Sequence, residues 1–260
     1  LCADTGHINV HESGAVEACG HKVSAIPSPD GKLTARQIEE AWHAHWDDET
    51  REHMPQPRMV YISQPTELGT IYSRKELQEI SGVCRRRGLY LYMDGARLGY
   101  GLCDEDNDLD LPAIASLCDA FYIGGTKVGA LFGEALVLRH EALKEDFRYI
   151  AKQKGGRLAK GRLLGIQFLE LFRDGLYFRL GAHADRLAVM LRDFCRSRGL
   201  SLPFSSGTNQ QFVTMPDSVL EELGRKYGFA YLRREDETHS TVRFCTSWAS
   251  KESDVDALIA

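Results

Sequence analysis

The amino-acid sequence predicts an α/β fold: a large domain whose mainly parallel β-sheet is flanked by helices, followed by a smaller C-terminal α+β domain. In the first half of the chain, short apolar segments alternate with segments that carry apolar residues at helical spacing. This alternation is typical of a sheet whose central strands are covered on both faces. After residue 140 the pattern changes to longer amphipathic segments and then to further strand-like and helical ones, which predicts the second domain.

Buried strands are predicted where five or six consecutive residues are apolar, β-branched or aromatic. The strands of the large domain are expected at 21–27, 58–63, 89–94, 120–125 and 133–139. In the small domain, strands are expected at 210–216 and 240–249.

Helices are predicted by apolar spacing together with recognisable ends. Thr34 is a suitable N-cap for a helix over 34–49. A second helix, over 73–88, begins with the capping box formed by Ser73 and Glu76 and ends at a glycine. Further helices are expected at 109–118, in three segments between 140 and 199, and at 217–228.

We divide the chain into a large domain, residues 1–160, and a small domain, residues 161–260. The first residues are expected to lie inside a strand, and the last inside a helix capped by Ser250 or Ser253. We therefore expect the large domain to be truncated at its N-terminus and the small domain at its C-terminus. We expect the sequence to be a fragment whose N-terminal part is missing.

Composition excludes several classes of function. The 260 residues are 43% hydrophobic and carry a net charge of −5, so they lack the basic footprint of a nucleic-acid-binding protein. No apolar stretch has the length of a membrane span. No group of histidine, cysteine and acidic residues has the spacing that is typical of a metal site. The seven cysteines are odd in number and scattered, which is typical of a reducing compartment. We expect a cytoplasmic protein.

Polar side chains follow three of the predicted strands. The segment "QPTELG" follows the strand at 58–63. Asp94 ends the strand at 89–94, and Arg97 follows it three residues later. Lys127 follows the strand at 120–125. Open α/β sheets bind ligands at the carboxyl ends of their strands. An amine, a carboxylate and a guanidinium at one edge suit pyridoxal phosphate, which uses a Schiff-base lysine, an aspartate at its ring nitrogen and an arginine for the substrate carboxylate. From spacing alone, a surface ion pair of Asp94 with Arg97 and a simple loop lysine remain open.

Longer motifs favour the cofactor site over a surface ion pair and a loop lysine. The stretches "MDGARLGYGL" and "FYIGGTKVGALFGEALVL", with "TGHINVHESGAVEACGHKV", "YISQPTELGTIYS" and "KGGRLAKGRLLGIQF", resemble the threonine aldolase and aromatic amino acid β-eliminating lyase family. The resemblance covers nearly all of the chain. It implies a pyridoxal 5'-phosphate (PLP) cofactor and the fold of the aspartate aminotransferase type, known as fold type I.

The resemblance assigns roles to five residues. Lys127 matches the lysine that binds the cofactor covalently, and Asp94 matches the aspartate at the pyridine nitrogen. Arg97 and Arg243 match the arginines that bind the substrate carboxylate, Arg97 lying also near the cofactor. His7 matches the histidine that stacks on the cofactor ring.

Two positions depart from the family pattern. Glu67 stands where the well-studied members carry a second active-site histidine, so a carboxylate would be the catalytic group near the substrate hydroxyl, and its pKa would have to be raised. The family's Gly-Thr phosphate loop lies upstream of this sequence. Thr126, next to Lys127, would supply part of the phosphate site.

The resemblance implies a lyase that cleaves β-hydroxy-α-amino acids of the threonine type to glycine and an aldehyde. Its partner would be a small-molecule amino acid substrate, and its assembly a homodimer or homotetramer. A β-eliminating lyase or racemase acting on another amino acid is the alternative within enzymes. A non-catalytic relative of the same fold is the alternative outside them.

Overall fold

The central sheet of the protein has the strand order β3-β4-β5-β6. A computed structural model describes all residues from Leu1 to Ala260. The sheet consists of β3 (Met59–Ser63), β4 (Tyr90–Asp94), β5 (Ala120–Gly124) and β6 (Glu134–Leu138). The first three strands are parallel and β6 is antiparallel to β5, which confirms the mainly parallel sheet that the sequence predicted.

The N-terminal segment lies beside the β3 edge of this sheet. Strand β1 (Cys2–Ala3) pairs in parallel with β2 (Ala25–Ile26), and the Tyr61 N–H donates a hydrogen bond to the Leu1 carbonyl. β2 is much shorter than the strand predicted over 21–27. The strand predicted for the first residues also ends early, because the chain turns into the short helices α1 (His7–Val10) and α2 (Ala15–Ala18).

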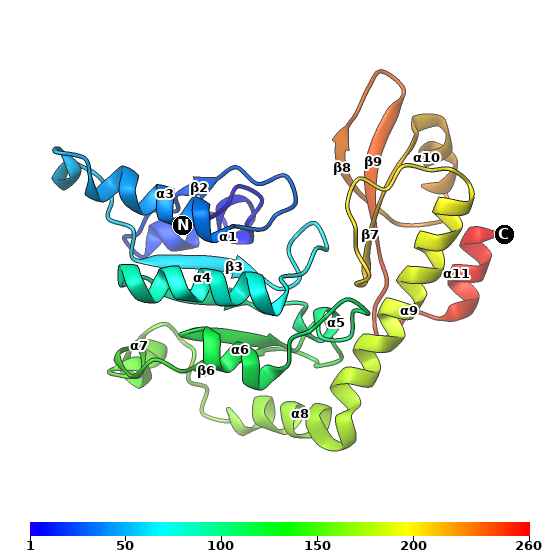
Figure 1. Cartoon of the computed structure of the whole chain (residues 1–260). Coiled ribbons are helices and arrows are strands. Elements are labelled where there is room, and N and C mark those ends of the chain that lie inside the picture. The colour runs from blue at the N-terminus through cyan, green and yellow to red at the C-terminus, as the bar shows by residue number, and fades with distance from the viewer.

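Three helices lie on one side of the central sheet in Figure 1: α3 (Ala35–Trp46), α4 (Arg74–Arg87) and α6 (Leu111–Leu117). Both predicted N-caps are present: Thr34 and Ser73 each form a complete capping box, and each box satisfies two backbone donors of its helix. Buried side chains of these helices and of one sheet face form the main core. They include Val60, Ile62, Leu91, Met93, Ile38, Leu77 and Ile80.

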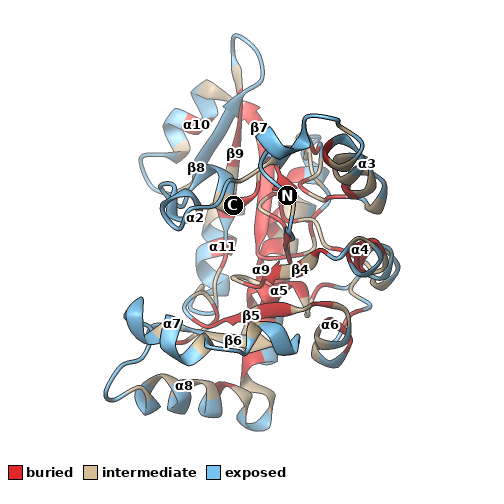
Figure 2. Ribbon diagram, turned by 90° about the vertical axis from the view of Figure 1, so that its left-hand side faces the viewer, coloured by how far each residue is buried: buried red, intermediate tan, exposed pale blue.

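Shorter elements, two of them within the range predicted for the small domain, lie around the central sheet. They are α5 (Leu98–Gly101), α7 (Phe147–Gln153), α8 (Arg162–Phe172) and 3-10 turns at Arg51–His53, Glu141–Leu143 and Arg173–Gly175. Burial is concentrated on the central strands, whereas α7 and α8 are largely exposed (Figure 2).

The small unit contains an antiparallel sheet with the order β7-β9-β8. Its elements are β7 (Gln210–Pro216), α10 (Asp217–Leu223), β8 (Ala230–Arg234), β9 (His239–Cys245) and α11 (Glu252–Ile259). The sequence did not predict β8, because all of its side chains are exposed and no burial pattern marks it. The N-cap of α11 is Lys251, which lies between the two serines that the sequence suggested.

The long helix α9 (Leu176–Ser197) runs alongside both sheets (Figure 1). The Tyr177 hydroxyl near its start donates to the Gly124 carbonyl at the end of β5, over 2.9 Å. Further along, the Thr246 hydroxyl after β9 donates to the Ala184 carbonyl, over 2.7 Å. None of the helices combines the length and the apolar character that crossing a membrane requires.

A buried carboxyl group in α9 gives a first testable prediction. Asp185 is 4% exposed, and neither of its side-chain oxygens has a hydrogen-bond partner. Burial, with the charge of Asp104 adding to it, raises the pKa of Asp185 to about 9. Because this pKa lies above the unfolded value of 3.8, the contribution to folding stability is full below about pH 4. It is lost as the pH rises toward about 9.

We therefore expect Asp185→Asn to increase the free energy of unfolding by about 2 kcal/mol or more near neutral pH, because the amide never ionises. The gain should shrink at acidic pH, where Asp185 is protonated in the folded and unfolded states. Urea unfolding of both proteins at an acidic and a mildly alkaline pH measures this. An equal effect at both pH values would show that the ionisation of Asp185 is not its cause.

Candidate active site

The three parallel strands end at the same level, where the sequence predicted the site. Ser63 at the end of β3 is in register with Asp94 at the end of β4. The Gly124 N–H at the end of β5 donates to the Gly95 carbonyl, over 2.9 Å. Gly95 is required here, because a Cβ on it would lie 1.9 Å from the Tyr122 carbonyl oxygen. The turns after β4 and β5 therefore pack directly against each other.

A cleft opens at these strand ends and collects five of the seven side chains that the sequence singled out. They are His7, Glu67, Asp94, Arg97 and Lys127. The cleft is mostly polar, and it is also lined by Glu12, Ser63, Pro65, Thr66, Ala96, Tyr122 and Glu134. Arg243 and Thr126 lie outside its lining.

Asp94 is held from several sides. Its side chain is buried, and one oxygen, Oδ1, accepts the Ala96 N–H over 2.8 Å. The hydroxyl of Tyr122 donates to the same oxygen, and the hydroxyl of Tyr61 donates to Oδ2. Hydrogen bonds of this kind stabilise an ionised carboxylate away from water.

The Lys127 amine is free of intrachain partners. Burial lowers the pKa of Lys127, and the nearby positive charge of Arg97 adds to this effect. The backbone around it is fixed, since the Tyr100 hydroxyl donates to the Lys127 carbonyl. A lysine with a lowered pKa spends more of its time as the neutral, nucleophilic amine.

Two guanidinium groups associated with different sheets are close enough to interact electrostatically. Arg97 follows β4, and Arg243 lies on β9. Burial lowers the pKa of Arg97, and the like charge of Arg243 contributes to the shift. Gln210 orients Arg243 by accepting a hydrogen bond from its Nη1 over 3.1 Å, while the buried Nε of Arg243 has no partner. Paired cations with an unsatisfied buried donor are suited to bind a carboxylate.

His7 is oriented by an acidic neighbour. Its Nδ1 lies 2.5 Å from Glu12 Oε1, and its ring centroid lies 4.8 Å from that of His11. A carboxylate at Nδ1 holds a proton on that nitrogen and leaves Nε2 as the acceptor of the neutral ring. Glu12 also lines the cleft, so the contact between Glu12 and His7 lies within it.

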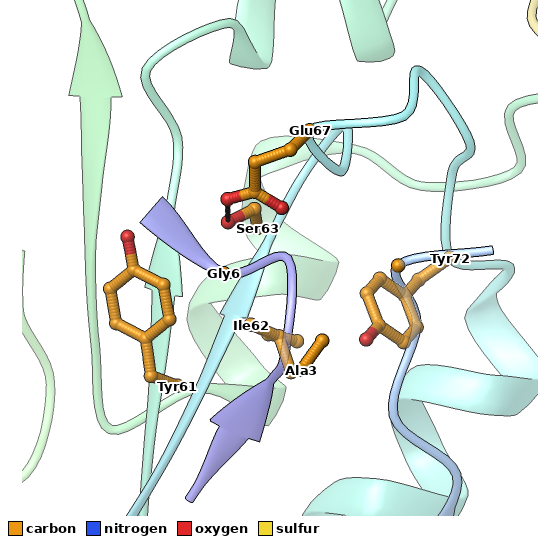
Figure 3. A pocket seen from close by; sticks show the side chains of 8 residues that line it. Ala3, Gly6, Tyr61, Ile62, Ser63, Glu67 and Tyr72 are labelled. Atoms are coloured by element: carbon orange, nitrogen blue, oxygen red, sulfur yellow. Dashed lines mark hydrogen bonds between the residues drawn. The ribbon is translucent and has the colours of Figure 1, made fainter. Parts of the chain in front are cut away.

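Glu67 lies against β3 and the N-terminal segment (Figure 3). Its Oε1 accepts the Ser63 hydroxyl over 2.7 Å and the His7 backbone N–H over 2.9 Å. Burial raises the pKa of Glu67, and the charge of Asp94 adds to this, although the two hydrogen bonds oppose it. The direction of the shift is the one that a carboxylate acting as a base near neutral pH requires.

Thr126 is engaged by Glu134. The Thr126 hydroxyl donates to Glu134 Oε1 over 2.7 Å, and the Gly125 N–H donates to the other oxygen of the same carboxylate. The hydroxyl has a single proton to donate, and it is used in this contact. A role of Thr126 in binding a phosphate therefore stays a prediction.

Sequence reasoning did not single out several residues of the site. These residues are the two tyrosines that bond to Asp94, Ser63, which bonds to Glu67, and Gln210, which bonds to Arg243. The tyrosines occur in apolar strands, where aromatic residues ordinarily indicate a core. Only the strand register reveals that their hydroxyls reach Asp94.

Comparisons with known proteins agree with this geometry. The family model of the beta-eliminating lyases matches residues 1–218. Across its whole length, the chain is 34% identical to a low-specificity L-threonine aldolase from a Pseudomonas species and covers 74% of it.

Solved structures give the same result. A Leishmania major threonine aldolase superposes with a TM-score of 0.94 at 43% identity, with 100% of this chain and 77% of that chain covered. A putative L-allo-threonine aldolase from Listeria monocytogenes, at 18% identity and a TM-score of 0.75, shares the fold; the match covers 99% of this chain and 72% of that one. The protein thus belongs to the beta-eliminating lyase family, whose members depend on PLP, and it is a homologue of the low-specificity L-threonine aldolases.

Proposed function

We propose that this protein is a PLP-dependent aldolase that cleaves L-threonine, L-allo-threonine and related β-hydroxy-α-amino acids to glycine and an aldehyde. One observation carries the proposal: an unpartnered amine, a buried carboxyl group and a guanidinium share one cleft with two acid–base groups. These residues are Lys127, Asp94, Arg97, His7 and Glu67.

The residues of the cleft fit the cofactor. The Lys127 amine has a lowered pKa and no competing partner, so it is suited to hold PLP covalently. Asp94 is suited to hold a proton on the ring nitrogen, and the flat imidazole of His7 to cover the ring. When bound, the cofactor supplies a sink for the electron pair that is left when the Cα–Cβ bond breaks.

Recognition of the amino acid falls to the two arginines. Arg97 and Arg243 bind the substrate carboxylate, which satisfies the unpartnered Nε of Arg243 and neutralises two neighbouring cations. Because one arginine comes from each unit, the substrate is held between the strand ends of the large sheet and β9 of the small one.

Proton transfer falls to His7 and Glu67. Glu67, or His7 through its Nε2, removes the proton from the substrate's β-hydroxyl, directly or through a water molecule that they position.

We propose that the enzyme works as a homodimer or homotetramer in the cytoplasm. Light scattering during size-exclusion chromatography measures the assembly directly.

The test of the function is an aldehyde assay. The purified protein is supplied with PLP, and its visible absorption is recorded to establish that cofactor is bound. L-threonine and L-allo-threonine are then added separately, and acetaldehyde and glycine are measured. We expect both products in equal amounts from at least one isomer. Bound cofactor without acetaldehyde from either isomer would overturn threonine cleavage and point to β-elimination or racemisation of another amino acid.

A further inference from the structure

Three tyrosines lie side by side on the face of the central sheet that carries Asp94. Tyr61 of β3 is in register with Tyr92 of β4, and Tyr92 with Ala120 of β5. Side chains two residues apart point to the same face of a sheet, so Tyr122 lies on this face beside Asp94. The rings of Tyr61 and Tyr92 stack with centroids 5.7 Å apart, and those of Tyr92 and Tyr122 are 6.4 Å apart.

The outer two tyrosines bond to Asp94, and the middle one does not. The Tyr61 hydroxyl donates to Oδ2 of Asp94 and the Tyr122 hydroxyl to Oδ1. Burial raises the pKa of both phenols, and the charge of Asp94 adds to this, so both stay protonated as donors. The hydroxyl of Tyr92 makes no hydrogen bond within the chain.

A count of acceptor sites shows what remains for a ligand. A carboxylate offers about four lone-pair sites, two on each oxygen. The Oδ1 atom of Asp94 receives the Tyr122 hydroxyl and the Ala96 N–H, and Oδ2 receives the Tyr61 hydroxyl. One site is therefore left, and it is on Oδ2.

We propose that Tyr61 and Tyr122 are positioning residues that hold Asp94 ionised and in one orientation, so that its remaining site on Oδ2 accepts the N–H of the cofactor's ring nitrogen. This inference rests on the proposed function, because it assumes PLP in the cleft. Two phenol donors stabilise the charged form of the carboxylate. The proton then stays on the ring nitrogen, where it strengthens the electron sink, and does not move to Asp94.

The experiment compares Tyr61→Phe, Tyr122→Phe and the double variant with the wild type. Tyr92→Phe is the matched control, since it removes a hydroxyl from the same row of rings without removing a bond to Asp94. Each protein is loaded with PLP whose ring nitrogen carries an NMR-active isotope. The nitrogen chemical shift reports whether that atom is protonated, and kcat and KM for L-threonine are measured on the same samples.

We expect each single variant to lose about tenfold in kcat, which is the value of one hydrogen bond to a charged group. The double variant should shift the nitrogen resonance toward that of an unprotonated ring, while KM changes by less than about threefold because the carboxylate-binding arginines are untouched. Tyr92→Phe should leave the nitrogen resonance at its wild-type position and kcat within about twofold of the wild type.

Two results would overturn the inference. A double variant with the wild-type nitrogen shift and kcat would show that the hydroxyls do not act on Asp94. An equal effect of Tyr92→Phe would show that the row of rings acts through packing. A wild type that binds no cofactor would instead overturn the proposed function itself, and the visible absorption of the wild type distinguishes that failure from the other two.

Discussion

Replacing Lys127 with alanine is expected to abolish aldehyde release from both threonine isomers, down to the rate without enzyme. In the proposed mechanism, the Lys127 amine holds the cofactor covalently, and the lining of the cleft contains no other lysine that could replace it. The visible absorption of covalently held cofactor should disappear in the same variant. The activity and the spectrum are measured on one preparation.

The Lys127→Ala substitution should not destabilise the folded state. The Lys127 amine has no hydrogen bond or ion pair within the chain, and burial of its ammonium is unfavourable, so alanine removes a cost and no polar interaction. We expect the free energy of unfolding to be unchanged or slightly raised. Lys160→Ala is the control, because Lys160 is exposed and outside the cleft, and it should keep wild-type activity. Aldehyde release by Lys127→Ala at more than a trace would show that another lysine binds the cofactor.

Glu67→Gln is expected to change activity and stability in opposite directions. Its amide oxygen still accepts the bonds from the Ser63 hydroxyl and the His7 N–H, so the geometry is kept while the base is lost. We expect kcat to fall about 100-fold or more, the contribution of a positioned general base. The variant should nevertheless be more resistant to urea near neutral pH.

The opposite signs follow from the raised pKa of Glu67, whose main cause is burial. A pKa above the unfolded value of 4.5 gives a stability contribution that is full below that value. The contribution is lost as the pH rises through the folded-state pKa. Activity needs the ionised form, so it rises over the same interval. The stability gain of Glu67→Gln should therefore vanish at acidic pH.

Profiles of kcat against pH and urea unfolding at two pH values test this pair of effects. If kcat stays within about threefold of the wild type, Glu67 is not the base, and His7, through its Nε2, takes that role. His7→Asn then becomes the informative variant, because it keeps a polar group beside Glu12 while removing the titratable ring.

Local rules predicted the parts of the fold whose energetics are local. The N-cap Thr34, the capping box of Ser73 and Glu76, and the glycine that ends α4 depend on near neighbours in sequence, and all are present. Strand β8 escaped prediction because its stability comes from hydrogen bonds to β9, while its side chains face solvent.

The charged residues of the site could be predicted from the sequence, but the residues that support them could not. Charged residues at the ends of buried strands, such as Asp94 and Lys127, are conspicuous in sequence because their burial needs a reason. Their supporting partners are not conspicuous, since Tyr61 and Gln210 become meaningful only through registers that bring distant strands together. The meeting of Arg97 with Arg243 likewise depends on how two sheets are joined.

Helix α9 spans that junction. At 22 residues it is about 33 Å long, and it touches the end of β5 through Tyr177 and the strand that carries Arg243 through Ala184 and Thr246. Through these two contacts, one helix connects the strand ends that carry Asp94 and Lys127 with the strand that carries Arg243. A substitution that shifted α9 would therefore be expected to move the carboxylate-binding arginine relative to the rest of the cleft. The orientation of the substrate's α-carbon, and with it the bond that is cleaved, would change in consequence.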